Sequence, residues 1–474
     1  MKKILLKVFL YFLVFFLLTN QLSYALITIP EEEKIGKQVL QELSSKVEFI
    51  QDIELVTYIN SIGNLLTKKG LEISPFNFRF YLIKEDSFNA FSVPGGYIFI
   101  NSGIFESIES EDELAGIMAH EMAHNVCRHI ARKLENIKKM QIAITAATLA
   151  AILLGGGKAG EAVSVTSSAL AETKLLFYSR ADEEEADRTG FQILTKAGYN
   201  PWGMVKIMEK LSQKSNFAIE VSYRYLFTHP LPQERVSYLI DLANKFRFSN
   251  YSPTIISSDP YYFKRLVIKA NIISKDPADL VLRYREELKT KEDPWLRYSL
   301  ALALAQQRFF KDGVSEMEEA LKGLPSKPYF LLDLAEIYFN SGDYQSALVI
   351  LEKIENFVGT ERAFEKIVYL KHQYLKARAF AETPQVFHAY EIFNKLKEEK
   401  MLENDPYFYF YFGKVCSKIN KDGEAHFYFG KYFELRGDYK TAYFHYKKAL
   451  SFLSEKDKMY NEIKKIIRTL EKKE

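Results

Sequence analysis

The sequence predicts a mostly α-helical chain in two parts, an α+β part with a few short strands followed by an all-α array of TPR-like repeats. Three observations carry this prediction. A helix with a start signal and closely spaced histidines begins near Ser110. Short aromatic and β-branched strand patterns precede it. From about Pro253 one helical pattern follows another, with prolines spaced by 34 residues.

The composition allows several packed domains and gives no reason to expect a nucleic-acid partner. The chain has 474 residues, 47% of them hydrophobic, and its 64 Lys+Arg nearly balance its 61 Asp+Glu. A net charge of +3 lacks the basic excess of a nucleic-acid-binding surface. The two cysteines, Cys127 and Cys416, could pair in an exported protein, but we expect Cys127 to be a buried free thiol.

Residues 1–25 are predicted to be a cleaved signal peptide. Three lysines are followed by the apolar run Val8–Leu18, and Ser23 and Ala25 are the small residues that a signal peptidase reads. The apolar run is short for a membrane span, which leaves an uncleaved anchor as the alternative. We therefore expect one domain over residues 26–250 and a second over residues 251–474.

Two helices and two strands are predicted before the histidines. The first helix begins at Ile29-Pro30, where acidic residues favour a helix N-terminus, and the second runs from about Asp52 to Lys68. Phe76–Ile83 begins with alternating apolar and polar residues and is predicted to be a strand. A turn at Pro94-Gly95-Gly96 then leads into a second strand.

This second strand is a candidate substrate-binding edge. Such an edge would pair with an extended peptide through its main chain. A plain hairpin is the alternative. The strand residues are Tyr97, Ile98, Phe99 and Ile100.

The central motif is His120-Glu121-x-x-His124. Residues four apart lie on one face of a helix, so both imidazoles can reach one ion, and Glu121 can take a proton from water at that ion. Ser110-x-x-Glu113 predicts a capping box at the start of this helix. The pattern predicts one catalytic zinc ion per chain, held by His120 and His124, with Glu121 as the general base.

A second helical tract follows, at Ile142–Leu154. It is apolar nearly all round and too short for a membrane span. We expect a buried helix. The alternatives are a mobile cover over the site and a peripheral membrane contact.

The next tract is acidic and supplies candidates for a third metal ligand. A carboxylate ligand would also offset the charge of the ion in a partly buried site. Spacing alone does not choose among Glu183, Glu184 and Glu185.

Together these motifs resemble a known family. His120-Glu-Met-Ala-His124-Asn-Val-Cys-Arg128-His129, the Pro94-Gly-Gly-Tyr segment before it and Ser179-Arg-x-x-Glu183-x-x-Ala-Asp187 after it are similar to the zinc metallopeptidases of the HtpX/CaaX-protease type. The exported BepA-like branch, which carries C-terminal repeats, is the most similar. This resemblance implies a gluzincin-type zinc metalloendopeptidase fold, in which a small sheet with an edge strand lies over the active-site helix.

The resemblance also implies roles for individual residues. His120, His124 and Glu183 match the metal ligands, Glu121 matches the base, and Asp187 would orient a ligand histidine. Thr228-His229-Pro-Leu-Pro-x-x-Arg235 matches as well. His229 would be either a fourth ligand that closes the site or a contact to the transition state. Arg235 would orient His229 or bind acidic groups. We assign Arg128 and His129 a structural role.

The C-terminal half is predicted to be a repeat array. Pro260, Pro294 and Pro328 are spaced by 34 residues, as in tetratricopeptide repeats, although the unit after Pro260 fits poorly. We expect Tyr407–Phe412 to be a buried helix after Pro406 rather than a strand. The tail Glu455–Glu474 is predicted to cap the array. Such arrays build a groove for peptides or partners.

These observations and the resemblance lead to one functional hypothesis and two alternatives. The hypothesis is a periplasmic zinc endopeptidase acting on misfolded or stalled envelope proteins in outer-membrane protein quality control, with repeats that recruit a substrate or the outer-membrane assembly machinery. The first alternative is a periplasmic chaperone or scaffold with a latent or structural zinc site. The second is a protease that contacts the membrane through Ile142–Leu154.

Overall fold

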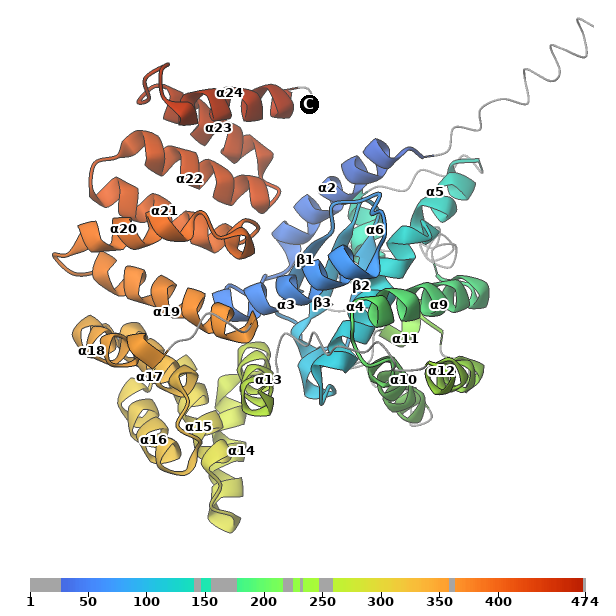
Figure 1. Ribbon diagram of the computed structural model, residues 1–474, viewed down its shortest axis with the longest axis horizontal. Coiled ribbons are helices and arrows are strands. Elements are labelled where there is room, and N and C mark those ends of the chain that lie inside the picture. Colours follow the sequence, from blue (N-terminus) through green and yellow to red (C-terminus); the bar gives the residue numbers. More distant parts are fainter. Residues whose placement is uncertain are drawn as a thin grey trace, which may run out of the picture.

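A computed structural model gives the fold of this chain (Figure 1). The predicted signal peptide, the predicted domain boundary near residue 250 and the first residues of Ile142–Leu154 lie outside the residues that it describes. The described residues are 27–139, 146–154, 177–215, 225–230, 233–246, 259–357 and 363–471.

The described part of the chain begins with the two predicted helices. α2 (Ile29–Lys46) is capped by Thr28, whose side chain and that of Glu31 form a capping box. α3 (Ile53–Leu65) is capped by Asp52 and continues into a π-helical turn, η1 (Leu66–Gly70). Both starts follow the sequence pattern, because each cap is a side chain that accepts a hydrogen bond from a free main-chain N–H of the first turn.

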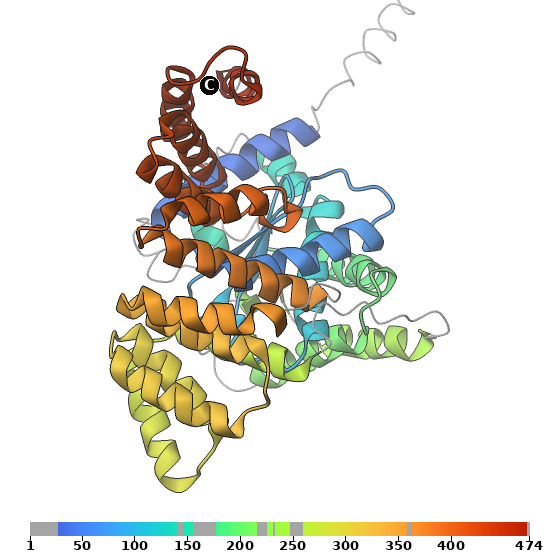
Figure 2. The same ribbon diagram turned by 60° about the vertical axis from the view of Figure 1, so that its left-hand side comes forward.

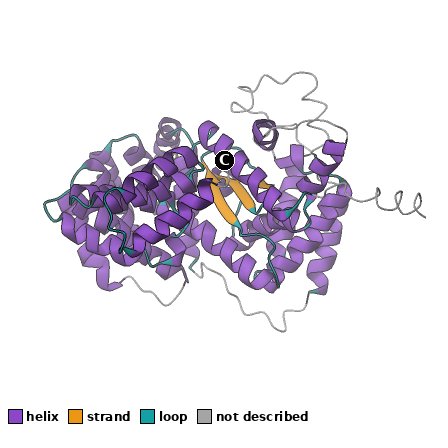
Figure 3. Cartoon of the chain, turned by 90° about the horizontal axis from the view of Figure 1, so that it is seen from above, coloured by secondary structure: helices purple, strands orange, loops and turns teal. Residues whose placement is uncertain are grey.

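Three short strands form a small mixed sheet in the order β1–β3–β2. β1 (Arg79–Ile83) pairs parallel with β3 (Tyr97–Asn101). β2 (Ala90–Val93), which the sequence pattern did not reveal, pairs antiparallel with β3 across the turn at residues 94–96. Figure 3 shows how little of the molecule this sheet makes up compared with the helices around it.

β3 is the central strand, so the predicted exposed edge at Tyr97–Ile100 is wrong. Its main chain is paired with β1 on one side and with β2 on the other, and Tyr97, Ile98, Phe99 and Ile100 are all buried. The hairpin alternative holds, since β2 and β3 form one. The strand that combines an edge position with packing against the histidine helix is β2.

The histidine helix is α4 (Glu111–Val126). Ser110 caps it by accepting from the Glu113 N–H at 3.3 Å. The predicted capping box is incomplete, because the Glu113 carboxylate accepts from the Glu109 N–H and from Lys210. η2 (Ser102–Glu106) precedes α4 and α5 (His129–Lys139) follows it.

The described part of Ile142–Leu154 is α6 (Ala146–Leu153), and it packs as a buried helix. Leu149, Ala150 and Leu153 belong to the same apolar cluster as Phe91 and Val93 of β2. The Asn89 side chain also donates to the Leu153 carbonyl at 3.3 Å. Within the described residues, no helix has the length and apolar character needed to cross a membrane.

Four further helices are described in the first part of the chain. They are α9 (Arg180–Lys196), α10 (Trp202–Ser215), α11 (Tyr225–Thr228) and α12 (Gln233–Lys245). They lie on the side away from the repeats (Figure 1), where α9 and α10 pack against α4 and α12 packs against α10.

From residue 260 the described chain is all helical, as predicted. Prolines begin α13, α14, α15, α17 and α21, and in four of these helices an aspartate caps the N-terminus. The aromatic run Tyr407–Phe412 lies in α21. The helices are α13 (Pro260–Ser274), α14 (Pro277–Thr290), α15 (Pro294–Gln306), α16 (Phe310–Gly323), α17 (Pro328–Ser341), α18 (Tyr344–Ile354), α19 (Ala363–Ala381), α20 (Val386–Leu396), α21 (Pro406–Lys418), α22 (Asp422–Leu435), α23 (Tyr439–Leu450) and α24 (Lys458–Glu471), with short 3-10 turns η4 (Glu355–Phe357) and η5 (Lys400–Leu402).

Two matching turns show why the repeat pattern was readable. In Ser-Gly-Asp-Tyr at residues 341–344 and Arg-Gly-Asp-Tyr at residues 436–439, the glycine has a positive φ, 87° in Gly342 and 80° in Gly437. Residues other than glycine rarely adopt this backbone conformation, so a glycine follows the end of the helix in each turn. The aspartate that follows caps the next helix in both turns.

The helical array curves along the first part of the chain and touches it near both ends and in the middle (Figure 2). α19 packs against α3, and α13 packs against η2. At the far end, the Ser44 hydroxyl of α2 donates to the Arg436 carbonyl at 2.7 Å.

Where α3 meets the array, charged side chains gather in a buried network that we call the α3–repeat ion cluster. Arg265 donates to Glu54 at 2.6 and 2.8 Å and to Asp333 at 2.5 and 2.6 Å. This network ties the two parts of the chain together. Its members are Asp52, Glu54, Arg265, Lys269, Asp333, Glu336 and Lys371.

Candidate metal centre

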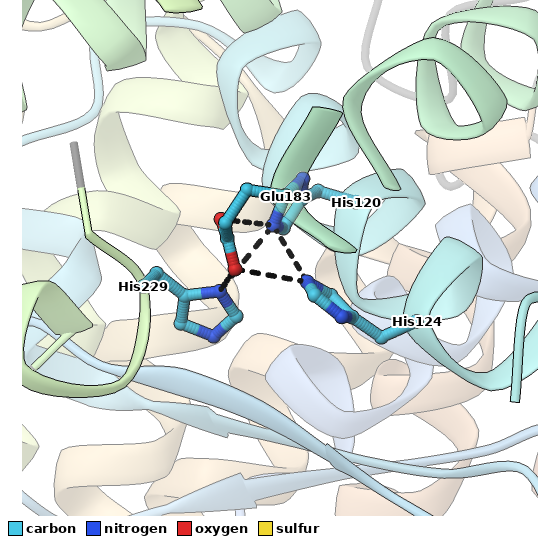
Figure 4. Close-up of side chains that lie close together, drawn as sticks. All are labelled: His120, His124, Glu183 and His229. Atoms are coloured by element: carbon cyan, nitrogen blue, oxygen red, sulfur yellow. Dashed lines mark hydrogen bonds and ion pairs between the residues drawn. The ribbon is translucent and has the colours of Figure 1, made fainter. Parts of the chain in front are cut away.

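α4 presents the two motif histidines in the buried centre of the first part of the chain. His120 and His124 lie one turn apart, and their Nε2 atoms are 3.0 Å from each other. Both side chains are buried, as is Glu121 between them in sequence. The prediction that residues four apart can reach one ion is therefore confirmed, since both imidazoles point their Nε2 atoms at one place (Figure 4).

α9 brings a carboxylate to the same point. Ser179 and Asp182 form a capping box that starts this helix. Gly190 then allows close approach, because a Cβ there would lie 3.1 Å from the backbone of His120. As a result, Glu183 Oε2 is 3.5 Å from His120 Nε2 and Glu183 Oε1 is 3.6 Å from His124 Nε2.

His229, just after α11, completes the set. Its Nδ1 is 3.0 Å from Glu183 Oε1 and 3.4 Å from His120 Nε2. The four donor atoms lie within 4.8 Å of one another, and all four residues are buried. Ligand atoms 2.0–2.1 Å from a zinc ion stand roughly 3.3–3.4 Å apart in a tetrahedron. Three imidazole nitrogens and a carboxylate oxygen at these separations therefore fit zinc.

Glu184 and Glu185, the other two candidates for the third ligand, point elsewhere. Glu184 pairs with Arg188 at 2.8 Å on the exposed face of α9. Glu185 accepts from Arg132 at 2.8 Å and lies 3.1 Å from His129. Of the three adjacent glutamates, the fold brings Glu183 to the histidines.

Asp187 and Arg235 hold the ligand side chains from behind. Asp187 Oδ1 is 2.9 Å from His120 Nδ1, the ring nitrogen that faces away from the centre. Arg235 donates twice to Asp187, at 2.8 Å each, and its Nη1 is 2.5 Å from Glu183 Oε2. Tyr238 also donates to Asp187. Arg235 thus binds acidic groups, one of its two expected roles.

Electrostatics favour a charged metal at this point. Burial lowers the pKa of His120, but Asp187 and Glu183 outweigh it and raise that pKa to about 9. Burial raises the pKa of Glu183, but His229 and Arg235 hold it well below its ordinary value. The carboxylates of Asp187 and Glu183 therefore favour a positive charge at His120, which a metal ion would supply. Glu183, which faces His120, stays ionised.

Glu121 has the surroundings of a base. Its side chain is buried, and its Oε1 is 3.6 Å from His229 Nε2. Among the described residues, neither carboxylate oxygen has a hydrogen-bond donor. Burial raises the pKa of Glu121, more than His229 and His120 lower it. A carboxylate with a raised pKa accepts a proton readily at neutral pH.

Two tyrosines and a histidine at this site were missed as functional candidates. The Tyr225 ring stacks on His229 with centroids 4.3 Å apart, and the Tyr178 ring lies 3.8 Å from the His124 ring. Tyr178 directly precedes the Ser179-Arg motif, which was a usable signal, whereas Tyr225 had none. His129, which we assigned a structural role, has its Nδ1 2.8 Å from His124 Nδ1. Cys127 is a free thiol, but only part-buried.

Comparison with known proteins agrees with this geometry. Residues 57–243 match the family described as Peptidase family M48. The chain is 27% identical over 372 residues to the β-barrel assembly-enhancing protease of Yersinia pestis. The aligned region covers 77% of this chain and 74% of that protein. It is 30% identical over 243 residues to the protein of the same name from Escherichia coli K12, or 50% of this chain and 48% of that one.

Two further likenesses are more distant. The mitochondrial metalloendopeptidase OMA1 of Schizosaccharomyces pombe is 29% identical over 35% of this chain and 46% of that protein. Among solved structures, the TPR domain of P58(IPK) aligns over 78% of this chain and 94% of that one, with 16% identity. Its TM-score of 0.16 is too low to bear on the fold. The matched segment, residues 57–243, contains all four converging donors, and this segment belongs to peptidase family M48, a family of metallopeptidases.

Proposed function

We propose that this chain is a zinc-dependent endopeptidase and that His120, His124 and Glu183 would hold the ion. The observation that carries the proposal is the convergence of buried donors beside Glu121, a buried carboxylate whose Oε1 lies 3.6 Å from His229 Nε2. A purely structural site needs no base, whereas peptide hydrolysis does. When bound, zinc supplies Lewis-acid chemistry that favours attack of water on a carbonyl.

Glu121 moves the proton in this proposal. Its carboxylate takes a proton from the attacking water and then delivers it to the nitrogen of the leaving amine. Burial supports both steps, because a pKa raised above the ordinary value brings the carboxylate nearer to neutral pH. Asp187 and Arg235 keep His120 and Glu183 in place during the reaction.

His229 decides whether the site is ready to act. Its Nδ1 lies among the other three donors, in the position of a fourth ligand. We propose that this arrangement is a latent state. Rotation of His229 away from the centre would admit water and leave its ring free to contact the oxyanion.

Substrate would approach along β2 rather than β3. β2 is an edge strand that packs on α4. The residues of β2 are nevertheless buried, and α6 belongs to the same apolar cluster as β2. We therefore propose that α6 moves away from β2 when a peptide binds, which combines the buried-helix and cover interpretations of this tract. A peptide main chain would then pair with Ala90–Val93.

The names of the relatives suggest where such an enzyme acts. Proteins called β-barrel assembly-enhancing proteases are similar to this chain. We propose export to the periplasm after removal of residues 1–25, action on misfolded or stalled outer-membrane proteins, and recruitment of substrate or assembly machinery by the TPR-like repeats of residues 251–474.

Cleavage of casein by the chain from residue 26 onward tests the proposal, with zinc content measured in parallel. We expect Glu121→Gln to retain zinc and to lose cleavage by about 10²–10⁴-fold. Glu183→Gln should lose zinc, whereas Glu184→Gln, its neighbour, should behave as the native chain does. Persistent cleavage by Glu121→Gln with zinc bound would rule out Glu121 as the base.

The position of His229 also favours a second candidate, a chaperone or scaffold with a closed zinc site. His229→Ala separates the two functions. If only this variant cleaves casein, His229 is a latch on a protease. If every variant binds one zinc and none cleaves, the chaperone is favoured, and suppression of aggregation of an unfolded outer-membrane protein becomes the assay.

A further inference from the structure

The hydrogen bonds of the metal centre continue on one side as far as the surface. His124 Nδ1 lies 2.8 Å from His129 Nδ1, and His129 Nε2 lies 3.1 Å from Glu185 Oε2. The same carboxylate oxygen accepts from Arg132 at 2.8 Å. The side chain of His129 is fully buried, whereas that of Glu185 is 48% exposed.

The backbone explains how His129 reaches this position. α4 ends at Val126, and Arg128 has a left-handed backbone with φ of 57°. This conformation is strained for a residue other than glycine. It turns the chain sharply between α4 and α5, and the Arg128 side chain is held by Glu32 at 2.6 Å. The turn carries the ring of His129 back beside His124.

Each proton along this line has one consistent position. A metal bound at His124 Nε2 takes the lone pair of that nitrogen, so the neutral ring carries its proton on Nδ1. That N–H can donate only to a His129 Nδ1 that bears a lone pair. The proton of His129 must then lie on Nε2, where Glu185 accepts it.

We propose that His129 and Glu185 are positioning residues that hold His124 in the tautomer and orientation needed for metal binding. We call His124–His129–Glu185 the histidine relay. The proposal rests on the zinc site of the proposed function. It places the support of His124 partly at the surface, in contrast to that of His120, which is supported by the buried carboxylate of Asp187.

The relay also predicts the metal stoichiometry. Cys127, His129 and Glu185 have donor atoms within 4.8 Å of one another, as a second metal site would. A metal at His129 Nε2 would move its proton to Nδ1, facing the His124 N–H only 2.8 Å away. Two donors cannot satisfy each other, so filling the first centre excludes a metal from the second cluster.

Zinc affinity of the full chain, measured by competition with a chromogenic chelator, tests the relay without relying on cleavage. His129→Phe keeps a ring but removes both nitrogens, and should weaken zinc binding about 10–100-fold. His129→Gln keeps an acceptor and should restore part of that loss. Glu185→Ala should weaken binding less than His129→Phe does, while Glu184→Ala, one residue away and paired with Arg188, should leave it unchanged.

Two readouts distinguish positioning from a merely structural role. In 15N-histidine NMR of the zinc-loaded chain, His129 should be protonated on Nε2, and titration with Zn²⁺ should saturate at one ion per chain. Unchanged zinc affinity in both His129→Phe and His129→Gln, protonation of His129 on Nδ1, or two tightly bound ions would each overturn the relay. Absence of cleavage with zinc bound would instead count against the proposed peptidase activity alone.

Discussion

The metal centre and the α3–repeat ion cluster are both buried groups of charged and polar side chains, but they are arranged differently. In the ion cluster the charges face each other, and Arg265 is satisfied on both sides by Glu54 and Asp333. In the metal centre the donor atoms face one common point, and Glu121 beside them has no hydrogen-bond donor among the described residues. Charges that pair hold a fold together, whereas donors that converge are available for a ligand.

The largest effect should come from breaking the paired cluster. Arg265→Met leaves Glu54 and Asp333 buried with one cation fewer, and we expect a loss of about 3–5 kcal/mol in the free energy of unfolding. Urea denaturation followed by circular dichroism measures it. Arg297→Met is the matched control, since Arg297 also contacts two carboxylates, those of Glu292 and Glu316, but is 26% exposed.

If the two substitutions destabilise the chain equally, burial does not set the strength of the cluster. If Arg265→Met does not fold, replacing Glu54 and Asp333 by Leu in the same chain should partly restore folding, because a buried pair can be exchanged for apolar groups. Failure of this rescue would mean that Arg265 acts through its packing against Tyr262 and Tyr329.

The next effect should appear in the metal centre and leave the fold intact. Asp187→Asn removes the charge that faces His120 Nδ1, and we expect zinc affinity to fall about 10–100-fold. Chelator competition measures the affinity, and thermal unfolding of the metal-free chain reports any structural damage. An unchanged zinc affinity would show that Arg235, rather than His120, is the partner that matters to Asp187.

Acid should separate the two regions. Burial raises the pKa of Asp52, but Lys269 and Lys371 outweigh it and lower the pKa to about 2. Its contribution to stability, about 2 kcal/mol, is therefore complete above the unfolded pKa near 4 and is lost as the pH falls from about 4 to 2. As the pH falls, zinc should leave before the pH reaches about 4. Protons compete with zinc for His120, because the pKa of this side chain is raised to about 9 in the metal-free site.

A pH titration with both zinc release and circular dichroism recorded checks this order. Asp52→Asn keeps a side chain that can cap α3 and should flatten the dependence of stability on pH between 4 and 2. Simultaneous loss of zinc and of secondary structure would show that the metal holds the fold together.

The sequence revealed the converging group and concealed the paired one for a physical reason. The sequence predicts the metal centre through a local motif, because a helix places residues four apart, such as His120 and His124, on one face. Arg265 lies 211 residues from Glu54 and 68 residues from Asp333, and a charged residue on a helix is predicted to be at the surface. Their burial depends on how the repeats dock on α3, which no local pattern encodes.

The sheet also shows that local patterns can be predicted from the sequence whereas contacts between distant segments cannot. The Pro94–Gly96 turn predicted a strand at Tyr97, and that strand exists as β3. Its central position depends on the parallel pairing with Arg79–Ile83, a contact made across the intervening chain. The prolines at 260, 294 and 328 succeeded because each signal is local: proline suits the first turn of a helix, where no main-chain N–H is needed.

The smallest effect should come from the rim of the ion cluster. Glu336 contacts Lys371 at 2.7 Å and Lys269 at 3.5 Å, but its side chain is 27% exposed. Water screens such a pair, so Glu336→Gln should change the free energy of unfolding by less than about 1 kcal/mol. Glu54→Gln, which alters a fully buried partner of Arg265, should cost several times more in the same urea denaturation. Equal costs would mean that the cluster behaves as one unit, in which the loss of any one of its four carboxylates changes the charge balance with its three cations by the same amount.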